Sequence, residues 1–574
     1  ASGGDIQISA NGQLSLAQTA ATGAINVNAA SLETQGPVYA GTTLNVQTQG
    51  NLTNQQSLAA RDRISLSAGG QLTNNGIIES GVNADNSRNT TGDVSLSAQT
   101  VSNTGHSVIA SRNLVLSGTT LNNVAGTLRS QQNLNITLTG GLDNSRGLLS
   151  SEALLAVSAA SLANRLGSLS SAGQLNIAVA GWVDNQGGQL VTDAGLDLHS
   201  GSLDNSQAGS LSAKGALNLA TGTFNNSDSG SVSAGGTLTL NAGQLSNQNN
   251  GRIASSGAMA ANVTGLDQQG GQLFSNTGLT LDLNHGQLNN TNGLITAPIL
   301  VLNNLNGVVN QGGEISSAQA FTLAANSLDN SNGRLLSNQT LTLRINQALS
   351  NIKGLIAAST IDAQAGSLDN SGGTVTSRGV LNLKVDGLLN NQNQGLIHAA
   401  SQLTILSSAL NNQNGSLLGG GISLDFGAAT GDLNNQGGLI TTDGQLTITH
   451  LRDLNNQGGE ISSAQSFNLA GRTVDNSTGD LISNGQLTVD ADTLINQNGL
   501  LSGWQGLSVS GGSLDNRNTG TLSSRSGDVN VSLRGALLNS ANGALVSQQT
   551  LTVTAASLDN RGGILSSGTD QTLT

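Results

Sequence analysis

Ser367-Leu-Asp-Asn-Ser-Gly-Gly-Thr-Val-Thr-Ser-Arg-Gly-Val-Leu-Asn-Leu-Lys-Val385 is one copy of a pattern that fills almost the whole chain. Aligned on its Leu-x-Asn anchor, here Leu368 and Asn370, the pattern occurs about 26 times between Leu32 and Leu558, with a mean step of about 21 residues. A fixed period of this size is typical of proteins built from stacked repeats. Residues 1–574 are therefore expected to form a single continuous repeat array.

Apolar and polar residues alternate over short runs within each repeat, as in Val380-Leu-Asn-Leu-Lys-Val385. This alternation predicts β-strands, and the intervening Gly and Asn residues predict turns. Three short strands and three turns make one rung of a parallel β-helix, and parallel crossovers are right-handed in nearly all proteins. We therefore predict an all-β fold: a right-handed parallel β-helix, or β-solenoid, of about 26 rungs with about 21 residues per rung, forming an elongated rod.

Composition excludes several classes of function. The net charge is −13 and no basic cluster occurs, which argues against nucleic-acid binding. The absence of cysteine excludes disulfides and cysteine metal sites; it reflects either chance or a chain that crosses membranes unfolded. No apolar run is long enough to span a bilayer, so we expect no membrane insertion by this segment.

The third anchor position is Asn in every copy except two, which carry Thr34 and Gln268. Asn tolerates turn geometry, and identical amides stacked at strand spacing can bond in a continuous ladder. We predict an inward-facing structural ladder; the alternative is a row of amides that binds glycans. The predicted ladder includes Asn144, Asn185, Asn205, Asn330, Asn370, Asn476, Asn516 and Asn560.

The acidic residues and histidines do not predict chemistry. Asp often fills the second anchor position, but only Asp184 and Asp204 fall in successive repeats, which favours a solvated turn over a calcium row. Glu314 and Glu460 occupy equivalent places in two near-identical blocks, too far apart to act as a catalytic pair. The five histidines share no repeat position. We therefore expect no catalytic, cofactor or metal site.

Residues 81–92 exceed the regular period and are polar and turn-rich, so we predict a protruding loop. A neutral insertion is the simpler interpretation. If the loop instead recognises a partner, its candidate residues are Asn83, Asp85, Asn86 and Arg88.

Leu203-Asp-Asn-Ser-Gln-Ala-Gly-Ser-Leu-Ser212 and Leu558-Asp-Asn-Arg-Gly-Gly-Ile-Leu-Ser-Ser567 resemble the repeats of filamentous haemagglutinins. These are two-partner secretion exoproteins, and they include the effector filaments of contact-dependent growth inhibition. The resemblance covers essentially the whole chain. It implies a monomeric filament outside the outer membrane of a Gram-negative bacterium, exported by an outer-membrane two-partner secretion transporter and directed at a receptor or glycan on a target cell.

The chain also departs from the family pattern. Neither Pro37 nor Pro298 lies in an Asn-Pro motif of the family's secretion domain, and no Val-Glu-Asn-Asn pretoxin motif occurs. The repeats begin and stop in mid-pattern, so we expect an internal fragment of a larger exoprotein. The predicted function is a structural and adhesive stalk without enzymatic activity, which projects a distal receptor-binding or toxin region; a growth-inhibition effector is favoured. The alternatives are a direct adhesin and a β-helical polysaccharide-cleaving enzyme.

Overall fold

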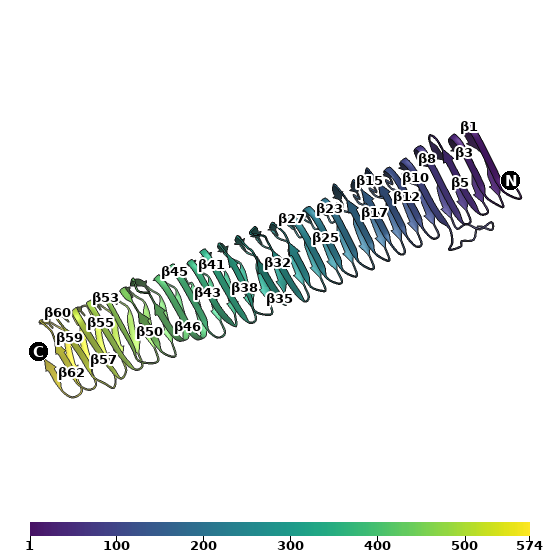
Figure 1. Cartoon of the computed structure of the whole chain (residues 1–574). Helices are drawn as coiled ribbons and strands as arrows, with labels where there is room; N and C mark the ends of the chain where they lie inside the picture. The colour runs from purple at the N-terminus through teal and green to yellow at the C-terminus, as the bar shows by residue number, and fades with distance from the viewer. The chain divides into compact units, whose positions relative to one another are not determined.

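The structure is a computed structural model that describes residues 1–574, with strands and turns and no helix. The chain divides into two compact units, residues 1–287 and 288–574. Within each unit, consecutive turns stack as a parallel β-solenoid (Figure 1). The predicted all-β solenoid is thus confirmed, whereas the right-handed coil and the single continuous array stay predictions.

The first unit begins with β1 and its strand bounds are as follows: β1 Ile6–Leu16, β2 Thr19–Ala21, β3 Ile25–Thr34, β4 Val38–Ala40, β5 Thr43–Thr48, β6 Leu52–Asn54, β7 Ser57–Ala60, β8 Arg63–Asn74, β9 Ile77–Ser80, β10 Asp93–Ser102, β11 Ser107–Ala110, β12 Leu114–Asn122, β13 Thr127–Ser130, β14 Leu134–Leu138, β15 Gly141–Asp143, β16 Leu148–Ser151, β17 Leu155–Ala159, β18 Ser161–Ala163, β19 Ser168–Ser171, β20 Leu175–Val179, β21 Trp182–Asp184, β22 Gln189–Thr192, β23 Leu196–Asp204, β24 Ser210–Ala213, β25 Leu217–Asn225, β26 Ser231–Ala234, β27 Leu238–Ser246, β28 Arg252–Ser255, β29 Met259–Asn262, β30 Gly265–Asp267, β31 Gln272–Ser275 and β32 Gly278–Asp282.

The boundary falls in β33 Gln287–Asn289. The second unit continues with β34 Leu294–Ala297, β35 Ile299–Asn303, β36 Gly307–Val309, β37 Glu314–Ser317, β38 Phe321–Ala325, β39 Ser327–Asp329, β40 Arg334–Ser337, β41 Thr340–Ser350, β42 Leu355–Ala358, β43 Thr360–Asp369, β44 Thr374–Ser377, β45 Leu381–Asn390, β46 Leu396–Asn411, β47 Ser416–Asp425, β48 Gly431–Asn434, β49 Leu439–Thr442, β50 Leu446–Thr449, β51 Leu451–Asn455, β52 Glu460–Ser463, β53 Phe467–Asp475, β54 Asp480–Ser483, β55 Gln486–Ile495, β56 Leu500–Gly503, β57 Gly506–Asp515, β58 Thr521–Ser524, β59 Val529–Leu533, β60 Ala536–Leu538, β61 Ala544–Ser547, β62 Leu551–Thr554, β63 Ser557–Asp559, β64 Ile564–Ser567 and β65 Gln571–Leu573.

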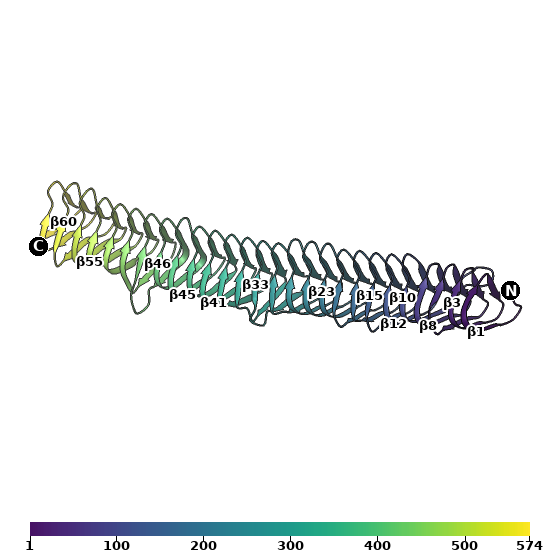
Figure 2. The ribbon, with the colours of Figure 1, turned by 90° about the horizontal axis from the view of Figure 1, so that it is seen from above.

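One turn consists of three short strands, as β13, β14 and β15 show. Each pairs in parallel with its equivalent in the following turn: β13 with β16, β14 with β17 and β15 with β18. Longer strands such as β12 bend between two stacks and pair with both β14 and β15. Because the register repeats, the corners of successive turns lie over one another within each unit (Figure 2).

The core lies inside each coil and is almost purely aliphatic. Side chains alternate between buried and accessible along each strand. Leu128, Leu134, Ile136 and Leu142 fill one turn, and none is more than 2% exposed. Stacked turns bury these side chains from both sides, so the stability of a turn depends mainly on its two neighbours.

The chain contains about 28 turns of about 20 residues, rather than about 26 turns. The anchor is first placed at Leu32, so the count misses the turn that precedes it. In β1, Leu14 and Leu16 pair with Leu32 and Thr34, so an apolar residue occupies that position in the first turn.

Candidate functional site

The predicted ladder residues lie at one corner of each turn, after the third strand. Asn144 is fully buried, and its Nδ2 donates to Asn164 Oδ1 at 2.8 Å in the next turn. The same nitrogen donates to the Gly147 carbonyl at 3.1 Å, and Asn123 Nδ2 donates to Asn144 Oδ1 at 2.7 Å. Each amide therefore joins three consecutive turns and ties down its own corner.

This arrangement repeats without interruption within each unit. Amide-to-amide distances are between 2.6 and 2.8 Å, with Thr34 to Asn54 at 2.9 Å and Asn247 to Gln268 at 3.1 Å at the two exceptional positions. The first unit's ladder contains Thr34, Asn54, Asn74, Asn103, Asn123, Asn144, Asn164, Asn185, Asn205, Asn226, Asn247 and Gln268. The second unit's ladder contains Asn290, Asn310, Asn330, Asn351, Asn370, Asn391, Asn412, Asn435, Asn456, Asn476, Asn496, Asn516, Asn539 and Asn560.

All of the predicted ladder residues thus take part in these two rows. Seven are completely buried, whereas Asn560 is half-buried. Every donor points toward the next turn along the chain, so the amide dipoles of each ladder are aligned. Apart from the end members of each row, both groups of every amide are bonded inside the protein, so these amides are not free to bind an external ligand.

The glycine three residues after a ladder Asn is required by close packing. A Cβ on Gly373 would overlap the Asn351 carbonyl oxygen and lie 2.8 Å from Asn370 Oδ1. The left-handed conformation falls on the preceding residue instead, which can be Arg146, Leu166 or Lys353. From the sequence alone, the left-handed conformation would be assigned to the glycine itself, because glycine is usually associated with positive φ.

The Asp residues of the second anchor position stabilise the same corner. Asp143 Oδ1 accepts a hydrogen bond from the Ser145 backbone N–H at 2.9 Å, and Asp369 bonds Ser371 in the same way. These are Asx turns. At Asp559, hydrogen bonds from Arg561 lower the pKa of the carboxyl to about 2.

A second buried polar column was missed by the sequence analysis. It lies at the end of the first strand of each turn, where Ser, Thr, Ala and Gly alternate. Ser377 Oγ donates to the Ser359 carbonyl at 2.9 Å, and Ser463 Oγ donates to the Gly444 carbonyl at 2.9 Å. In many repeats a Ser follows Leu-x, and this Ser could have indicated the column. The period was hard to see because Ala, Gly or Thr occupies the same position in other repeats.

Residues 81–92 leave the stack between β9 and β10 (Figure 1). Val82 and Arg88 form an antiparallel bridge, and Arg88 Nη2 bonds Glu79 Oε2 at 3.0 Å. Asn83 accepts a bond from Asn89 at 3.1 Å, while Asp85 accepts one from Ser87 at 2.6 Å. Hydrogen bonds and an ion pair therefore hold the segment to itself and to the adjacent turn. Asn86 has a positive φ of 63°.

A hollow of about 730 Å³ lies between this loop and the nearby turns. Tyr39, Arg61, Asn83 and Asp85 line it. Burial raises the pKa of the Tyr39 hydroxyl, which has no hydrogen-bond partner. Arg61 is engaged by Asp62, with Nε and Oδ1 3.0 Å apart.

The acidic residues of the duplicated blocks have different partners. Glu314 pairs in register with Arg334, and Nε lies 3.4 Å from Glu314 Oε2. Glu460 pairs in register with Asp480, whose pKa is raised by burial and by the charge of Glu460. No group of three or more His, Cys, Asp or Glu side chains is placed to hold a metal ion.

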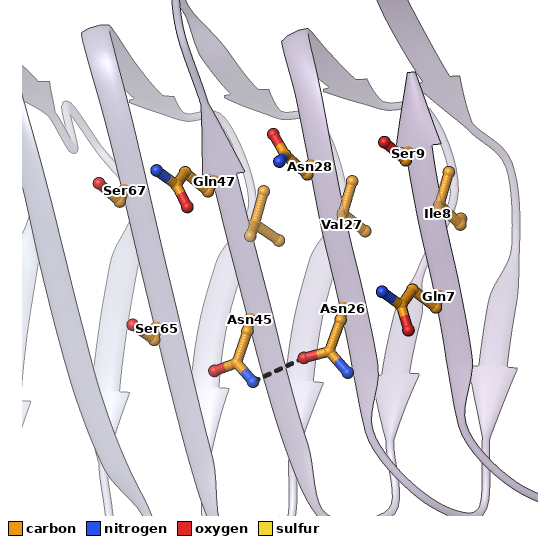
Figure 3. A pocket seen from close by; sticks show the side chains of 11 residues that line it. Gln7, Ile8, Ser9, Asn26, Val27, Asn28, Asn45, Gln47, Ser65 and Ser67 are labelled. Atoms are coloured by element: carbon orange, nitrogen blue, oxygen red, sulfur yellow. Dashed lines mark hydrogen bonds between the residues drawn. The ribbon is translucent and has the colours of Figure 1, made fainter. Parts of the chain in front are cut away.

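Uncharged polar side chains line one part of the outer face of the second strand stack in the first unit. Figure 3 shows this face at β1, β3, β5 and β8, where a shallow hollow of about 350 Å³ is lined by amides and hydroxyls. Asn45 Nδ2 donates to Asn26 Oδ1 of the adjacent turn at 2.9 Å.

A family model described as the haemagglutinin repeat matches most of the chain, over residues 1–18, 20–76, 79–146, 118–178, 170–242, 233–297, 278–353, 343–393, 482–541 and 522–574. The chain belongs to the haemagglutinin repeat family. Searches of curated proteins and of solved structures return no match.

The haemagglutinin-repeat ladder also continues where the family model does not match. Between residues 394 and 481, Asn412, Asn435, Asn456 and Asn476 bond in sequence at 2.7 Å. This stretch therefore has the same architecture as the matched repeats.

Family and fold together indicate a structural, adhesive filament rather than an enzyme. Proteins of the haemagglutinin repeat family are secreted or lie at cell surfaces. No helix of this structure has the length and apolarity needed to cross a bilayer.

Proposed function

We propose that this chain is the shaft of a secreted exoprotein on the exterior of a Gram-negative outer membrane, and that it projects a distal receptor-binding or toxin region toward a target cell. The unbroken amide ladder of each unit is the observation that carries this proposal. A ladder that joins every turn to the next resists local opening, because each broken amide leaves buried partners unsatisfied. Such a segment is suited to holding another region at a distance.

The distal region that we favour is the effector of a contact-dependent growth inhibition system. Export would use an outer-membrane two-partner secretion transporter, as in related haemagglutinin-repeat exoproteins. The support for both is the family membership. Surface display should be lost when the transporter gene is deleted, and producing cells should inhibit contacting cells that lack immunity.

An in-register deletion tests the shaft directly. Removal of residues 331–351 joins Asn330 to Ile352. The new junction reads Asn-Ile-Lys-Gly, the same sequence as residues 351–354 of the native chain. We expect target-cell inhibition or attachment to survive this deletion. Removal of residues 331–341 shifts the register and should abolish both display and activity. If the in-register variant is displayed normally but inactive, the deleted surface itself performs recognition and the shaft proposal is wrong.

A direct adhesin is the second candidate, and the hollow beside residues 81–92 favours it. Asn83 and Asp85, which line this hollow beside Tyr39, could contact a receptor or glycan. Replacement of residues 83–89 by a short Gly-Ser linker should then abolish binding of the labelled chain to cells. Unchanged cell binding would exclude the loop.

A further inference from the structure

A charge-free strip runs along the second strand stack of the first unit, from β1 to β20. Its inner row starts with Gln7, Asn26, Asn45 and Ser65, which are register partners in consecutive turns. Its outer row starts two residues later in each strand, at Ser9. We call these two rows the neutral strip.

Both rows continue in register through the middle turns. Ser65 pairs with Ser95, which pairs with Val115, and Val115 pairs with Asn135. Ala156 and Asn176 complete the inner row at β17 and β20. No side chain of either row carries a charge, in a protein whose net charge is −13. The first charged side chain of the inner row is Asp197, in the following turn.

The strip is hollowed at two places. The first hollow is that of Figure 3. The second, of about 520 Å³, lies over β14, β17, β20 and β23; strip side chains such as Asn135 and Asn176 line most of it, and Asp197 and His199 of β23 line its far end. Small side chains at Ala156 and Ala178 leave space between the larger amides, so the surface has room for a ligand.

One polar atom in the second hollow has no partner. Asn176 Oδ1 is buried and makes no hydrogen bond within the protein. A buried carbonyl oxygen without a donor is costly, so the Asn176 amide has an unmet hydrogen-bonding need at the wall of this hollow. Among the strip side chains, only Asn45 and Asn26 hydrogen-bond to one another. The remaining amides and hydroxyls keep their donors and acceptors for solvent or a ligand.

We propose that the neutral strip binds an extended, uncharged polysaccharide chain that lies along the stack. Sugar hydroxyls both donate and accept, as do the Asn, Gln, Ser and Thr side chains of the strip. Stacked strands lie about 4.7–4.9 Å apart, close to the length of one pyranose in an extended chain, so successive sugars can meet equivalent side chains. The methyl groups of Ala156 and Ala178 offer apolar contact to the C–H faces of the rings. Neither row offers a cationic side chain to an anionic polymer.

The inference goes beyond the shaft function and can fail independently of it. The test uses the full chain and calorimetric titration with cellohexaose, chitohexaose and laminarihexaose, with hexagalacturonate as the acidic comparator. The test variant is the double substitution Asn135→Ala and Asn176→Ala, which Ala156 at the same position shows to be compatible with the fold. The matched control is Asn382→Ala, an exposed strand position of β45 in the second unit.

We expect at least one neutral hexasaccharide to bind, with an affinity about tenfold weaker in the double variant and unchanged in the control. Ser158→Trp, on the exposed outer row, should block the hollow and abolish binding. Absence of binding by every neutral hexasaccharide, preference for hexagalacturonate, or equal affinity in the wild type and the strip variants would overturn the proposal. Self-association that the strip variants reduce, measured by sedimentation without sugar, would instead assign the surface to a second copy of the chain.

Discussion

A single ladder amide has more hydrogen bonds to lose than its small size suggests. Asn370 is fully buried, accepts from Asn351, and donates to Asn391 and to the Gly373 carbonyl. Its removal leaves an unpaired donor in one neighbouring turn and an unpaired acceptor in the other. The ladder therefore makes each corner sensitive to substitution.

We expect Asn370→Ala to lower the free energy of unfolding by about 2–6 kcal/mol, because two buried polar groups lose their partner at about 1–3 kcal/mol each. Thermal and urea unfolding measure this, and hydrogen exchange should locate the opening at Asn351 and Asn391. Asn382→Ala, on the exposed face of β45, should change stability by less than about 0.5 kcal/mol. Equal effects of the two substitutions would contradict the ladder's structural role.

The corner glycines make a separate prediction, because steric overlap and backbone conformation fall on adjacent residues. Gly373→Ala should destabilise the protein by at least about 2 kcal/mol, since the new Cβ meets backbone that cannot move freely. Gly372→Asn should be tolerated within about 1 kcal/mol, because Asn332 adopts the same left-handed conformation at the equivalent place. Denaturant unfolding measures the stability of the two variants. If Gly372→Asn loses more stability than Gly373→Ala, then backbone conformation, rather than steric overlap, is the reason for glycine at these positions.

At the scale of strands, the duplicated blocks 311–321 and 457–467 differ in what faces them. Glu314 on β37 meets Arg334 on β40, whereas Glu460 on β52 meets Asp480 on β54. The second pairing places like charges in register, which is unfavourable in a sheet. The raised pKa of Asp480 reflects burial and this proximity.

Asp480→Arg should therefore raise the free energy of unfolding by about 0.5–1 kcal/mol at pH 7. Because the folded-state pKa of Asp480 is raised, ionisation of Asp480 destabilises the wild type at neutral pH, and this penalty disappears as the pH falls through that pKa. The gain should thus shrink in acid, as unfolding measured from pH 7 to pH 4 would show. The reciprocal Arg334→Asp should destabilise; if it does not, register pairing has little effect on these charges.

The register of the strands also decides what could be predicted from sequence. The period of Leu-x-Asn and the alternation in Val380–Val385 were enough to predict strands, parallel stacking and an inward amide row. The neutral strip was not predictable, because its members come from nine different repeats and meet only through the observed pairing. The Ser377 and Ser463 column was hidden because Ala and Gly fill the same position elsewhere.

At the scale of the whole chain, paired carboxylates make the free energy of unfolding depend on pH in the acid range. Arg112 lowers the pKa of Asp93, Arg472 lowers that of Asp453, and Arg517 lowers that of Asp515. Groups with a lowered folded-state pKa stabilise the protein above the ordinary value of 3.8, and lose this contribution as the pH falls through the folded-state pKa, which is about 2 for Asp559.

We therefore expect the melting temperature to fall steeply between about pH 4 and pH 2. Arg517→Ala should reduce the dependence in this range, because Asp515 would regain a more ordinary pKa. Differential scanning calorimetry across the range provides the measurement. A melting temperature that is constant down to pH 2 would show that these pairs contribute nothing to stability.

The repeated register has a consequence for the history of the gene. Recombination between similar repeats that removes or adds a whole turn leaves every amide with a partner, whereas one that removes half a turn exposes the core. Selection can therefore change the length of such a chain without redesigning its interior. The near-identical blocks Gln311–Phe321 and Gln457–Phe467 are the expected trace of such an event, and their unlike partners, Arg334 and Asp480, record the divergence that followed.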